Sequence, residues 1–491
     1  MKLKVDLENK RFVAEVEHDH ERGLPLAHGF WFNPEIKSWV TNSLKSAFSM
    51  VHYATPETIK FLSRLTIQKI PLENFEVKYP PHLKPYPFQL DAVKFSAAQN
   101  RSLLHIDAGC GKSAIAAMLS ASLNVHPLVI APPFLKATLE KEFKTWAPNI
   151  SPAFLSDMQL NKDIAQRLLK TRSMGDSLLI VDECHRMKSL NAARTRALFK
   201  IFVKRFKRVV FMSGTPMPNR PIELFPILSH CAPEIIDFSD EHEFALKYCN
   251  AYQGAFGWDY TGASNTDILF QKMRDSFSFR VRKEDVLKDL PERIESILIL
   301  DKKEPPKMAA FSQKIIHDLK EGSESIEALI KNPKSSTYRK ELGIFKAPIV
   351  AEIARELCEG GEPLLVFAHH KDVVSKLCEK LSDFTPLKID GSVPVSERQK
   401  IVEEFQKEKS PHKILILNIQ AGGVGFTLTK AARVLFAESS WVPAENSQAI
   451  DRAHRIGQTR GVIAYHCVLP NTLDAFILSS ILTKTKTLNQ M

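Results

Sequence analysis

The segment LLHIDAGCGKS, residues 103–113, joins an apolar run to a glycine-rich turn. Such a turn between a strand and a helix exposes backbone N–H groups that bind phosphate oxygens, and the helix dipole adds to this attraction. Lys112 is then placed to reach the β- and γ-phosphates of a nucleotide, and the Ser113 hydroxyl can ligate Mg²⁺. The complete GxxxxGK[ST] pattern requires glycine at position 106, where this chain has Ile106. The apolar run directly before the turn nevertheless predicts a nucleotide site.

Apolar runs with strand character recur along the chain and alternate with helical stretches. They are residues 127–131, 178–181 and 208–212 in the first half, and 363–367, 387–391, 414–417 and 434–437 in the second. Continuous apolar strands between helices predict parallel sheets that are covered on both faces. The motifs follow directly after strands, at the carboxyl edge where open α/β sheets bind ligands. We therefore expect an α/β protein with two parallel-sheet lobes.

An acidic pair, Asp182 and Glu183, follows directly after the apolar run 178–181. One carboxylate can hold the Mg²⁺ shell, and the other can orient and deprotonate the attacking water. Two adjacent acids can also cap the N-terminus of a helix, as they do in many α/β folds. The position of this pair downstream of the glycine-rich turn favours the catalytic interpretation.

The run QAIDRAHRIGQ, residues 448–458, contains two arginines with the spacing of one helical face. The planar guanidinium groups of Arg452 and Arg455 suit the spread charge of a phosphoryl-transfer transition state. An ordinary solvated helix face has the same spacing, but the neighbouring Gln448 and Asp451 favour a functional interpretation. We predict that the second lobe delivers these arginines to a nucleotide held by the first, which is the layout of a motor.

Size and composition describe a large globular protein with a basic surface. The 491 residues suffice for two or three domains, each with its own core. The net charge of +11 suits a polyanionic partner such as DNA, because Lys and Arg neutralise phosphates. Seven cysteines without a CxxC pair predict free thiols in a reducing compartment. The polar N-terminus and the lack of a long apolar run predict an intracellular protein, in cytoplasm, nucleoid or nucleus, without a membrane partner.

The chain divides into four predicted segments. Residues 1–75 form an accessory module, in which the alternation of aromatic and polar side chains over 29–40 indicates a β-hairpin. Its aromatic side chains could stack on bases or fill a small core. The first lobe is expected at 76–291 and the second at 346–491. The charged segment 292–345 has helical periodicity, and we expect it to form a helical linker or protrusion.

These motifs together resemble those of the Swi/Snf-type ATPases of helicase superfamily two, over roughly residues 83–475. The segments that carry the resemblance are PFQ (87–89), AP (131–132) with Phe143 and Trp146, DECH (182–185) with Lys188, SGTP (213–216), FAHH (367–370), AGGVGFTLT (421–429) and the run 448–458. Parts of segments 220–224, 248–250, 257–265 and 286–291 further resemble the annealing-helicase (HARP-type) branch, whose members rewind or remodel branched DNA.

The resemblance implies two RecA-like lobes with helical insertions, a small N-terminal β-rich accessory module, and the use of ATP with Mg²⁺. The implied catalytic residues are Lys112, Asp182, Glu183, Arg452 and Arg455. The implied nucleotide-binding residues are Gln89, which would read adenine, with Gly109, Cys110, Gly111, Lys112, Ser113, Gly425 and Gln448. The implied ligands of Mg²⁺ are Ser113 and, through water, Asp182.

The chain departs from the family pattern at two places. Ser113 replaces the usual threonine and keeps the hydroxyl for Mg²⁺, whereas Cys110 suggests a thiol-sensitive loop. Asn418-Ile419-Gln420 stands where the family has Ser and Thr near DNA phosphate, which leaves the detail of that contact open.

The activity implied by the resemblance is that of an ATP-dependent translocase, acting as a monomer on duplex or branched DNA without sequence preference. It would remodel or reanneal DNA, or displace bound protein. A strand-separating helicase that acts on DNA or RNA is one alternative, which a comparison of triplex and duplex substrates distinguishes. A nucleotide-gated DNA-binding scaffold without turnover is another, which ATP hydrolysis with and without duplex DNA distinguishes.

Overall fold

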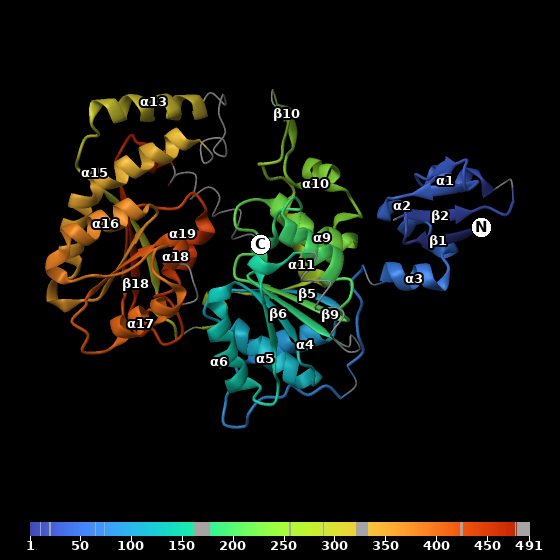
Figure 1. The fold of residues 1–491 in the computed structure, drawn as a ribbon, viewed down its shortest axis with the longest axis horizontal. Helices are drawn as coiled ribbons and strands as arrows, with labels where there is room; N and C mark the ends of the chain where they lie inside the picture. Colours follow the sequence, from blue (N-terminus) through green and yellow to red (C-terminus); the bar gives the residue numbers. More distant parts are fainter. Residues whose placement is uncertain are drawn as a thin grey trace.

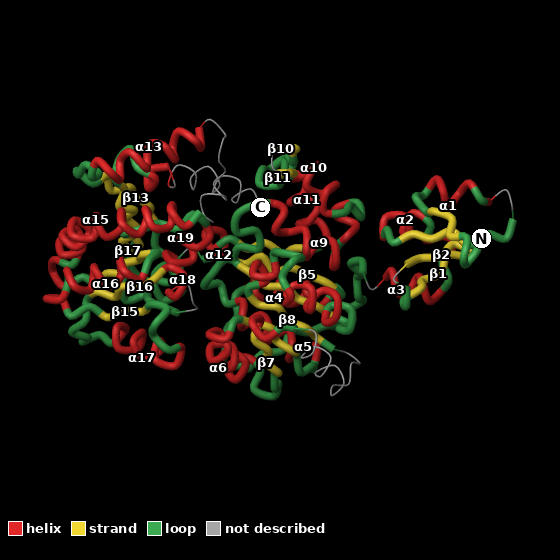
Figure 2. Tube along the Cα trace, turned by 45° about the horizontal axis from the view of Figure 1, so that its top comes forward, coloured by secondary structure: helices red, strands yellow, loops and turns green. Residues whose placement is uncertain are grey.

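The computed structural model describes residues 1–9, 11–18, 21–63, 65–72, 74–161, 177–254, 257–287, 289–320, 332–422, 426–476 and 478. Three parts follow one another along the chain: an N-terminal module, a first lobe in the middle of the molecule, and a second lobe on its far side (Figure 1). The two lobes are α/β units whose strands are flanked by helices on both sides (Figure 2). Among the described residues, no helix is long and apolar enough to span a membrane.

The N-terminal module is built on a four-stranded antiparallel sheet with the strand order β1-β2-β4-β3. Its elements are β1 (Lys2–Asp6), β2 (Arg11–Glu15), α1 (Gly23–Ala27), β3 (Trp31–Asn33), β4 (Ser38–Thr41), α2 (Leu44–Ser49) and α3 (Pro56–Ser63). Strands β3 and β4 form the predicted hairpin, with Trp31 opposite Val40. Phe12, Phe30 and Leu62 belong to the core beneath the sheet.

The first lobe contains a six-stranded parallel sheet with the order β12-β5-β9-β8-β6-β7. Its strands are β5 (Arg101–Ile106), β6 (Leu128–Ala131), β7 (Ala153–Ser156), β8 (Leu178–Asp182), β9 (Arg208–Ser213) and β12 (Ser278–Val281). Every residue of β5, β8 and β9 is buried, as predicted for strands covered on both faces. The helices α4 (Pro87–Ala97), α5 (Lys112–Leu123) and α6 (Lys136–Trp146) cover one face.

A helical insertion in the first lobe follows β9 and covers the other side of the sheet. It contains α9 (Phe225–Cys231), α10 (Glu241–Tyr248), the hairpin of β10 (Tyr252–Gly254) and β11 (Gly257–Asp259), and α11 (Thr266–Ser276). The hairpin projects away from the lobe (Figure 1). The chain then returns to β12 beside β5, and the short helix α12 (Lys283–Val286) follows.

The second lobe contains another six-stranded parallel sheet, with the order β13-β18-β17-β14-β16-β15. Its strands are β13 (Arg293–Ile299), β14 (Leu364–Ala368), β15 (Leu387–Ile389), β16 (Ile414–Asn418), β17 (Arg433–Phe436) and β18 (Val462–Val468). Its helices are α13 (Pro306–Lys320), α15 (Pro333–Leu357), α16 (Lys371–Lys380), α17 (Val395–Gln406), α18 (Ile419–Gly422) and α19 (Pro443–Ile450). Apolar clusters pack on both faces of this sheet, as they do in the first lobe.

Strand β13 differs from the helical structure predicted for residues 292–345. It pairs in parallel with β18 along its whole length, from Arg293 opposite Val462 to Ile299 opposite Val468. Arg293, Glu295 and Ser296 alternate with or precede its apolar residues, and much of this edge strand is exposed, so the sequence lacks the continuous apolar run of the central strands. The segment therefore begins with a strand of the second lobe, and its last helix, α15, continues to Leu357.

Candidate active site

A cleft of about 1,070 Å³ lies between the two lobes. On the first lobe it is lined by the loops that follow β5, β8 and β9, where the carboxyl ends of parallel strands meet. On the second lobe it is lined by α19 and the turns after it. The glycine-rich loop, the acidic pair and the arginine run, far apart in the sequence, therefore meet in one place.

The phosphate loop, residues 107–113, is shaped by two glycines with left-handed backbone conformations. Gly109 has φ +86° and Gly111 has φ +78°, values that side-chain-bearing residues rarely adopt. A Cβ atom would lie 2.7 Å from Arg455 Cγ at Gly109 and 2.3 Å from Gln89 Nε2 at Gly111. Lys112 begins α5, and its ammonium donates hydrogen bonds to the carbonyls of Ile106 (2.9 Å) and Asp107 (3.3 Å).

Gln89 binds the backbone of the phosphate loop. Its Nε2 donates to the Cys110 carbonyl at 3.3 Å, and its Oε1 accepts from the Tyr86 N–H at 2.9 Å. Cys110 is fully buried, and burial raises the pKa of its thiol to about 11. Thiol chemistry requires the thiolate, so the structure contradicts the expectation of a thiol-sensitive loop.

Asp182 ends β8 and Glu183 follows it, and both line the cleft together with the phosphate loop. Glu183 has φ +49°, and its backbone N–H donates to Asp182 Oδ1 at 2.9 Å. Burial and the charge of Glu183 raise the pKa of Asp182. Burial would also raise the pKa of Glu183, but the hydrogen bond and charge of His185 hold it low. His185 Nδ1 lies 3.3 Å from Glu183 Oε2 and 3.0 Å from Ser213 Oγ. Of the two groups, Glu183 is therefore the one that stays ionised.

The arginine run does not form the helix face that its spacing suggested. Helix α19 ends at Ile450, and residues 451–457 form successive turns that end at Gly457, with φ +96°. Gln458 fixes this conformation, because its Nε2 donates to the carbonyls of Thr429, Ala431 and Ala453.

Both arginines of the run nevertheless line the cleft. Arg452 is buried, and its charge is among those that lower the pKa of Glu183. Arg455 packs against Gly109 and donates from Nη1 to the Phe426 carbonyl at 3.1 Å. The turns thus bring both side chains to the cleft that the phosphate loop also lines.

Gln448 contacts the first lobe directly, because its Nε2 donates to Thr215 Oγ1 at 3.0 Å. Ser113 also lines the cleft. Gly425 lies outside the described residues.

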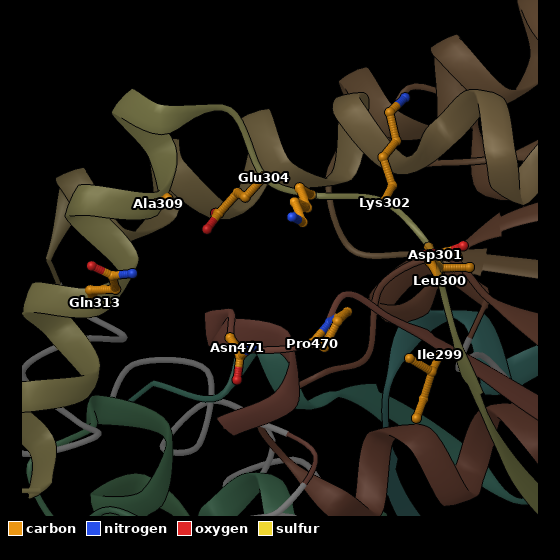
Figure 3. Close-up of a pocket in the computed structure, with 10 residues that line it drawn as sticks. Ile299, Leu300, Asp301, Lys302, Glu304, Ala309, Gln313, Pro470 and Asn471 are labelled. Carbon is orange, nitrogen blue, oxygen red and sulfur yellow. The ribbon is translucent and has the colours of Figure 1, made fainter.

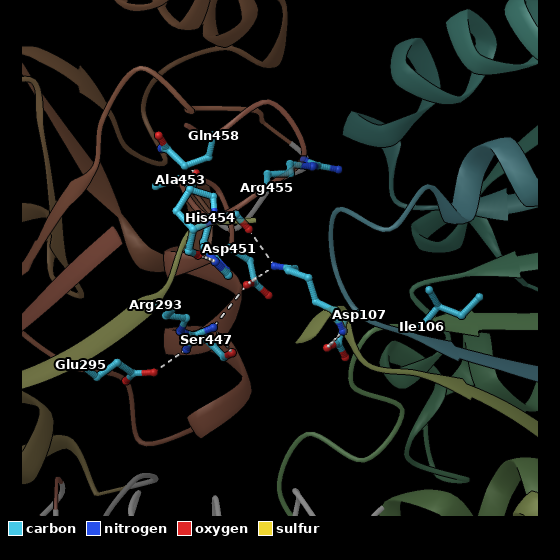
Figure 4. A network of polar contacts seen from close by, with 12 residues as sticks. Ile106, Asp107, Arg293, Glu295, Ser447, Asp451, Ala453, His454, Arg455 and Gln458 are labelled. Atoms are coloured by element: carbon cyan, nitrogen blue, oxygen red, sulfur yellow. Dashed lines mark hydrogen bonds and ion pairs between the residues drawn. The ribbon is translucent and has the colours of Figure 1, made fainter. Parts of the chain in front are cut away.

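Several charged residues at the cleft were not identified from the sequence (Figure 4). Asp107 pairs with Arg280 at 2.6 Å, while Lys283 and Arg293 pair with Asp451 at 2.7 and 3.3 Å. In the sequence Arg280, Lys283 and Arg293 belong to ordinary mixed-charge stretches, and Asp107 lies in the glycine-rich segment without a sign of its partner. Asp451 directly precedes Arg452, and nothing in the neighbouring sequence indicates its partners.

A second cavity, of about 630 Å³, lies beside the end of β13, α13 and the segment after β18. Lys302 and Glu304 contribute to its lining but point in different directions (Figure 3).

Two known domain families match parts of this chain. A helicase conserved C-terminal domain model matches residues 349–457, and an SNF2-related domain model matches residues 159–331. Two parallel-sheet lobes with a shared cleft and these two matches are the features of a helicase-like ATPase core. The chain belongs to the SNF2-related family.

Its relatives include two proteins that are much longer. The SWI/SNF-related matrix-associated actin-dependent regulator of chromatin subfamily A-like protein 1 of Xenopus tropicalis is 32% identical over 452 residues, covering 87% of this chain and 47% of that protein. The DNA annealing helicase and endonuclease ZRANB3 of Homo sapiens is 32% identical over 431 residues, covering 80% of this chain and 39% of that protein. The chain thus spans about half or less of their lengths.

Among solved structures, the Sulfolobus solfataricus SWI2/SNF2 ATPase core in complex with dsDNA covers 85% of this chain and 98% of that chain. The sequence identity is 20% and the TM-score is 0.38.

Proposed function

We propose that this protein is an ATP-dependent DNA translocase that hydrolyses ATP in the cleft between its lobes. One observation carries the proposal: Arg455 of the second lobe packs against Gly109 of the phosphate loop in the first. A site that needs groups from both lobes couples nucleotide turnover to lobe movement, because the lobes must approach for hydrolysis and separate for release.

The catalytic roles divide between the lobes. From the first lobe, Lys112 binds the β- and γ-phosphates, and Glu183 orients and deprotonates the attacking water. From the second, Arg452 and Arg455 stabilise the charge that develops on the transferred phosphoryl group.

Binding of the nucleotide is assigned to the phosphate loop and to residues around it. The backbone N–H groups of Gly109, Cys110 and Gly111 cradle the phosphates. Gln89 reads adenine after exchanging its hydrogen bond to the Cys110 carbonyl for one to the base. Gly425 and Gln448 add contacts from the second lobe.

The residues at the phosphate loop suit Mg²⁺. Ser113 supplies a hydroxyl oxygen and Asp182 a carboxylate oxygen, and hard oxygen donors are what this ion prefers. The described residues hold no cluster of three or more His, Cys, Asp or Glu side chains that could bind a metal. Mg²⁺ keeps several waters and takes further oxygens from phosphates, so it needs few protein ligands. When bound, the ion neutralises phosphate charge.

Duplex or branched DNA is the proposed partner. The net charge of +11 favours a polyanion, and backbone contacts give little sequence preference. One relative is named as a DNA annealing helicase, which supports remodelling or reannealing as the outcome of translocation. Displacement of bound protein is a second outcome of the same movement, and a monomer suffices for it.

The decisive experiment measures ATP hydrolysis by the full chain with and without duplex, forked and single-stranded DNA and RNA. We expect DNA to stimulate the wild type, and Glu183→Gln to lower kcat by about 100-fold or more, since general-base catalysis contributes 10²–10⁴-fold. Near-full activity of Glu183→Gln would refute the assignment.

Strand displacement distinguishes the alternatives. A translocase removes the third strand of a triplex without unwinding a plain duplex, whereas a strand-separating helicase unwinds the duplex. Tight, nucleotide-dependent DNA binding without turnover in the wild type would instead indicate a scaffold.

A further inference from the structure

Lys283 occupies a place beside the phosphate loop that the sheet register determines. Strand β12 pairs with β5, with Val281 opposite Ile106, so the residues after the two strands emerge side by side. The Lys283 backbone N–H donates to Asp107 Oδ2 at 2.9 Å, and Arg280 binds the other oxygen of the same carboxylate at 2.6 Å. The start of α12 is therefore fixed to the first residue of the phosphate loop.

The side chain of Lys283 reaches the other lobe. Its Nζ donates to Asp451 Oδ1 at 2.7 Å and to the His454 carbonyl at 2.7 Å. Figure 4 labels these two acceptor residues at the cleft. The exposed fractions of the Lys283 and Asp451 side chains are only 7% and 12%. A lysine so enclosed needs its partners, because a buried charge without them is strongly destabilising.

Each of the two acceptors on the second lobe lies next to one of the two arginines in the sequence. Asp451 directly precedes Arg452, and His454 directly precedes Arg455. Lys283 therefore binds the turns that carry Arg452 and Arg455, while the two arginines line the cleft. One residue thus spans from the phosphate loop to the arginine run, through its N–H at one end and its ammonium at the other.

A second set of contacts to the same turns comes from Pro291 and from Arg293, the first residue of β13. Arg293 Nη1 lies 3.3 Å from Asp451 Oδ1, and His454 Nε2 lies 2.7 Å from the Pro291 carbonyl. Both come from the segment that follows α12, on the way into the second lobe. Lys283 is the member of this network that is fixed to the first lobe.

We propose that Lys283 is a positioning residue, which sets the register of Arg452 and Arg455 against the phosphate loop. The inference rests on the proposed ATPase function and adds a role for a residue outside the phosphate loop, acidic pair and arginine run. Misplacement of a catalytic group by about 1 Å can cost 10²-fold in rate, so a device that fixes this register affects kcat.

The experiment compares Lys283→Met, Asp451→Asn and the double variant of the full chain, with kcat and the KM for ATP measured at saturating duplex DNA. We expect each single variant to lower kcat on the order of 10- to 100-fold and to change KM less than about 3-fold. The double variant should be faster than the product of the two single losses predicts, because both single variants remove the Lys283–Asp451 contact. Lys283→Arg, which keeps the charge, should recover part of kcat.

Two results would overturn the proposal. A rise in KM with unchanged kcat would mean that Lys283 binds the nucleotide directly, and multiplicative losses in the double variant would mean that Lys283 and Asp451 act separately. Lys272→Met is the matched control, since Lys272 also pairs with a carboxylate, that of Asp237, but outside the cleft. Its kcat should equal that of the wild type.

Glu183→Gln separates this inference from the function on which it rests. If Glu183→Gln is inactive while Lys283→Met keeps its kcat, only the positioning role fails. If Glu183→Gln remains active, the proposed function fails. Thermal unfolding of each variant checks that it folds, and Asp451→Asn, which keeps the shape of the side chain, tests the same contact if Lys283→Met does not.

Discussion

Buried polar groups connect the two lobes, whereas a stack of aromatic rings lies between helix α2 of the N-terminal module and the first lobe. Between the lobes, Lys283 pairs with Asp451 and Gln448 bonds to Thr215. At the module, the ring of Phe48 stacks on Phe238 with centroids 4.2 Å apart and an angle of 23° between planes.

The difference in chemistry indicates a difference in movement. Buried charges can exchange one partner for another, such as a phosphate oxygen, so a polar junction can open and close with nucleotide. A ring stack gains its energy from contact area and geometry and has no such substitute. Phe238 and the preceding Asp237 both have φ +55°, a conformation that costs free energy and is retained where the ring meets the module. We infer that the lobes move and the module stays attached.

The largest effect that tests this comparison is expected at the polar junction. Arg455→Ala should lower kcat by about 10³-fold, because an arginine that stabilises a phosphoryl-transfer transition state contributes 10³–10⁵-fold. Single-turnover ATP hydrolysis with bound duplex DNA measures it. Arg460→Ala is the control, since Arg460 pairs with Glu362 on the surface and should keep full activity. Equal rates for the two variants would remove Arg455 from the mechanism.

A smaller effect is expected where one neutral hydrogen bond joins the lobes. Thr215→Val removes the hydroxyl that accepts from Gln448 and keeps the shape of the side chain. One hydrogen bond contributes about 0.5–1.5 kcal/mol net, so kcat should fall about 2- to 12-fold. Thr215→Ser retains the hydroxyl and should restore the rate. If valine and serine behave alike, this contact does not contribute to closure.

At the module, the ring stack should affect attachment and not chemistry. Phe48→Ala and Phe238→Ala each remove one ring, and an aromatic pair contributes about 0.5–1.5 kcal/mol beyond its buried area. Limited proteolysis between α3 and α4 should therefore become faster in both variants, by similar factors. ATP hydrolysis without DNA should stay within about 2-fold of the wild type, because neither ring lines the cleft between the lobes. A change of that size corresponds to under 1 kcal/mol. A large loss of basal turnover would mean that the module belongs to the motor.

The parts of the fold that could be predicted are those encoded by neighbouring residues. Residues 178–182 contain both the buried strand and the polar group at its carboxyl end, so the same short segment predicts the strand and the site residue. Strand β13 could not be predicted in this way. It lies at the edge of the described sheet, and the strand with which it pairs, β18, begins only at Val462, far away in the sequence. An edge strand with exposed isoleucines has no local signal that separates it from a charged helix.

The candidate site shows the same limit. The glycine loop and the arginine run are local motifs, and they identified two sides of the cleft. Lys283 is a single lysine in the mixed-charge segment RVRKEDV, residues 280–286, and its partner Asp451 lies 168 residues away. Even the arginines were placed on a helix, because the Gln458 hydrogen bonds that shape the turns depend on carbonyls of Thr429 and Ala431, distant in sequence.

The smallest effect is expected from the ion pair beside the ring stack, between Lys45 and Glu243. Its Nζ and Oε1 lie 3.6 Å apart, and the two side chains are 57% and 47% exposed, whereas Lys283 and Asp451 are enclosed. Solvent and salt screen an exposed pair, and the entropy lost in holding two long side chains offsets the attraction that remains. Lys45→Met should therefore leave the proteolysis rate and the thermal midpoint unchanged at physiological salt, while Lys283→Met slows turnover. A faster release of the module in Lys45→Met would show that charge, and not the ring stack alone, attaches it.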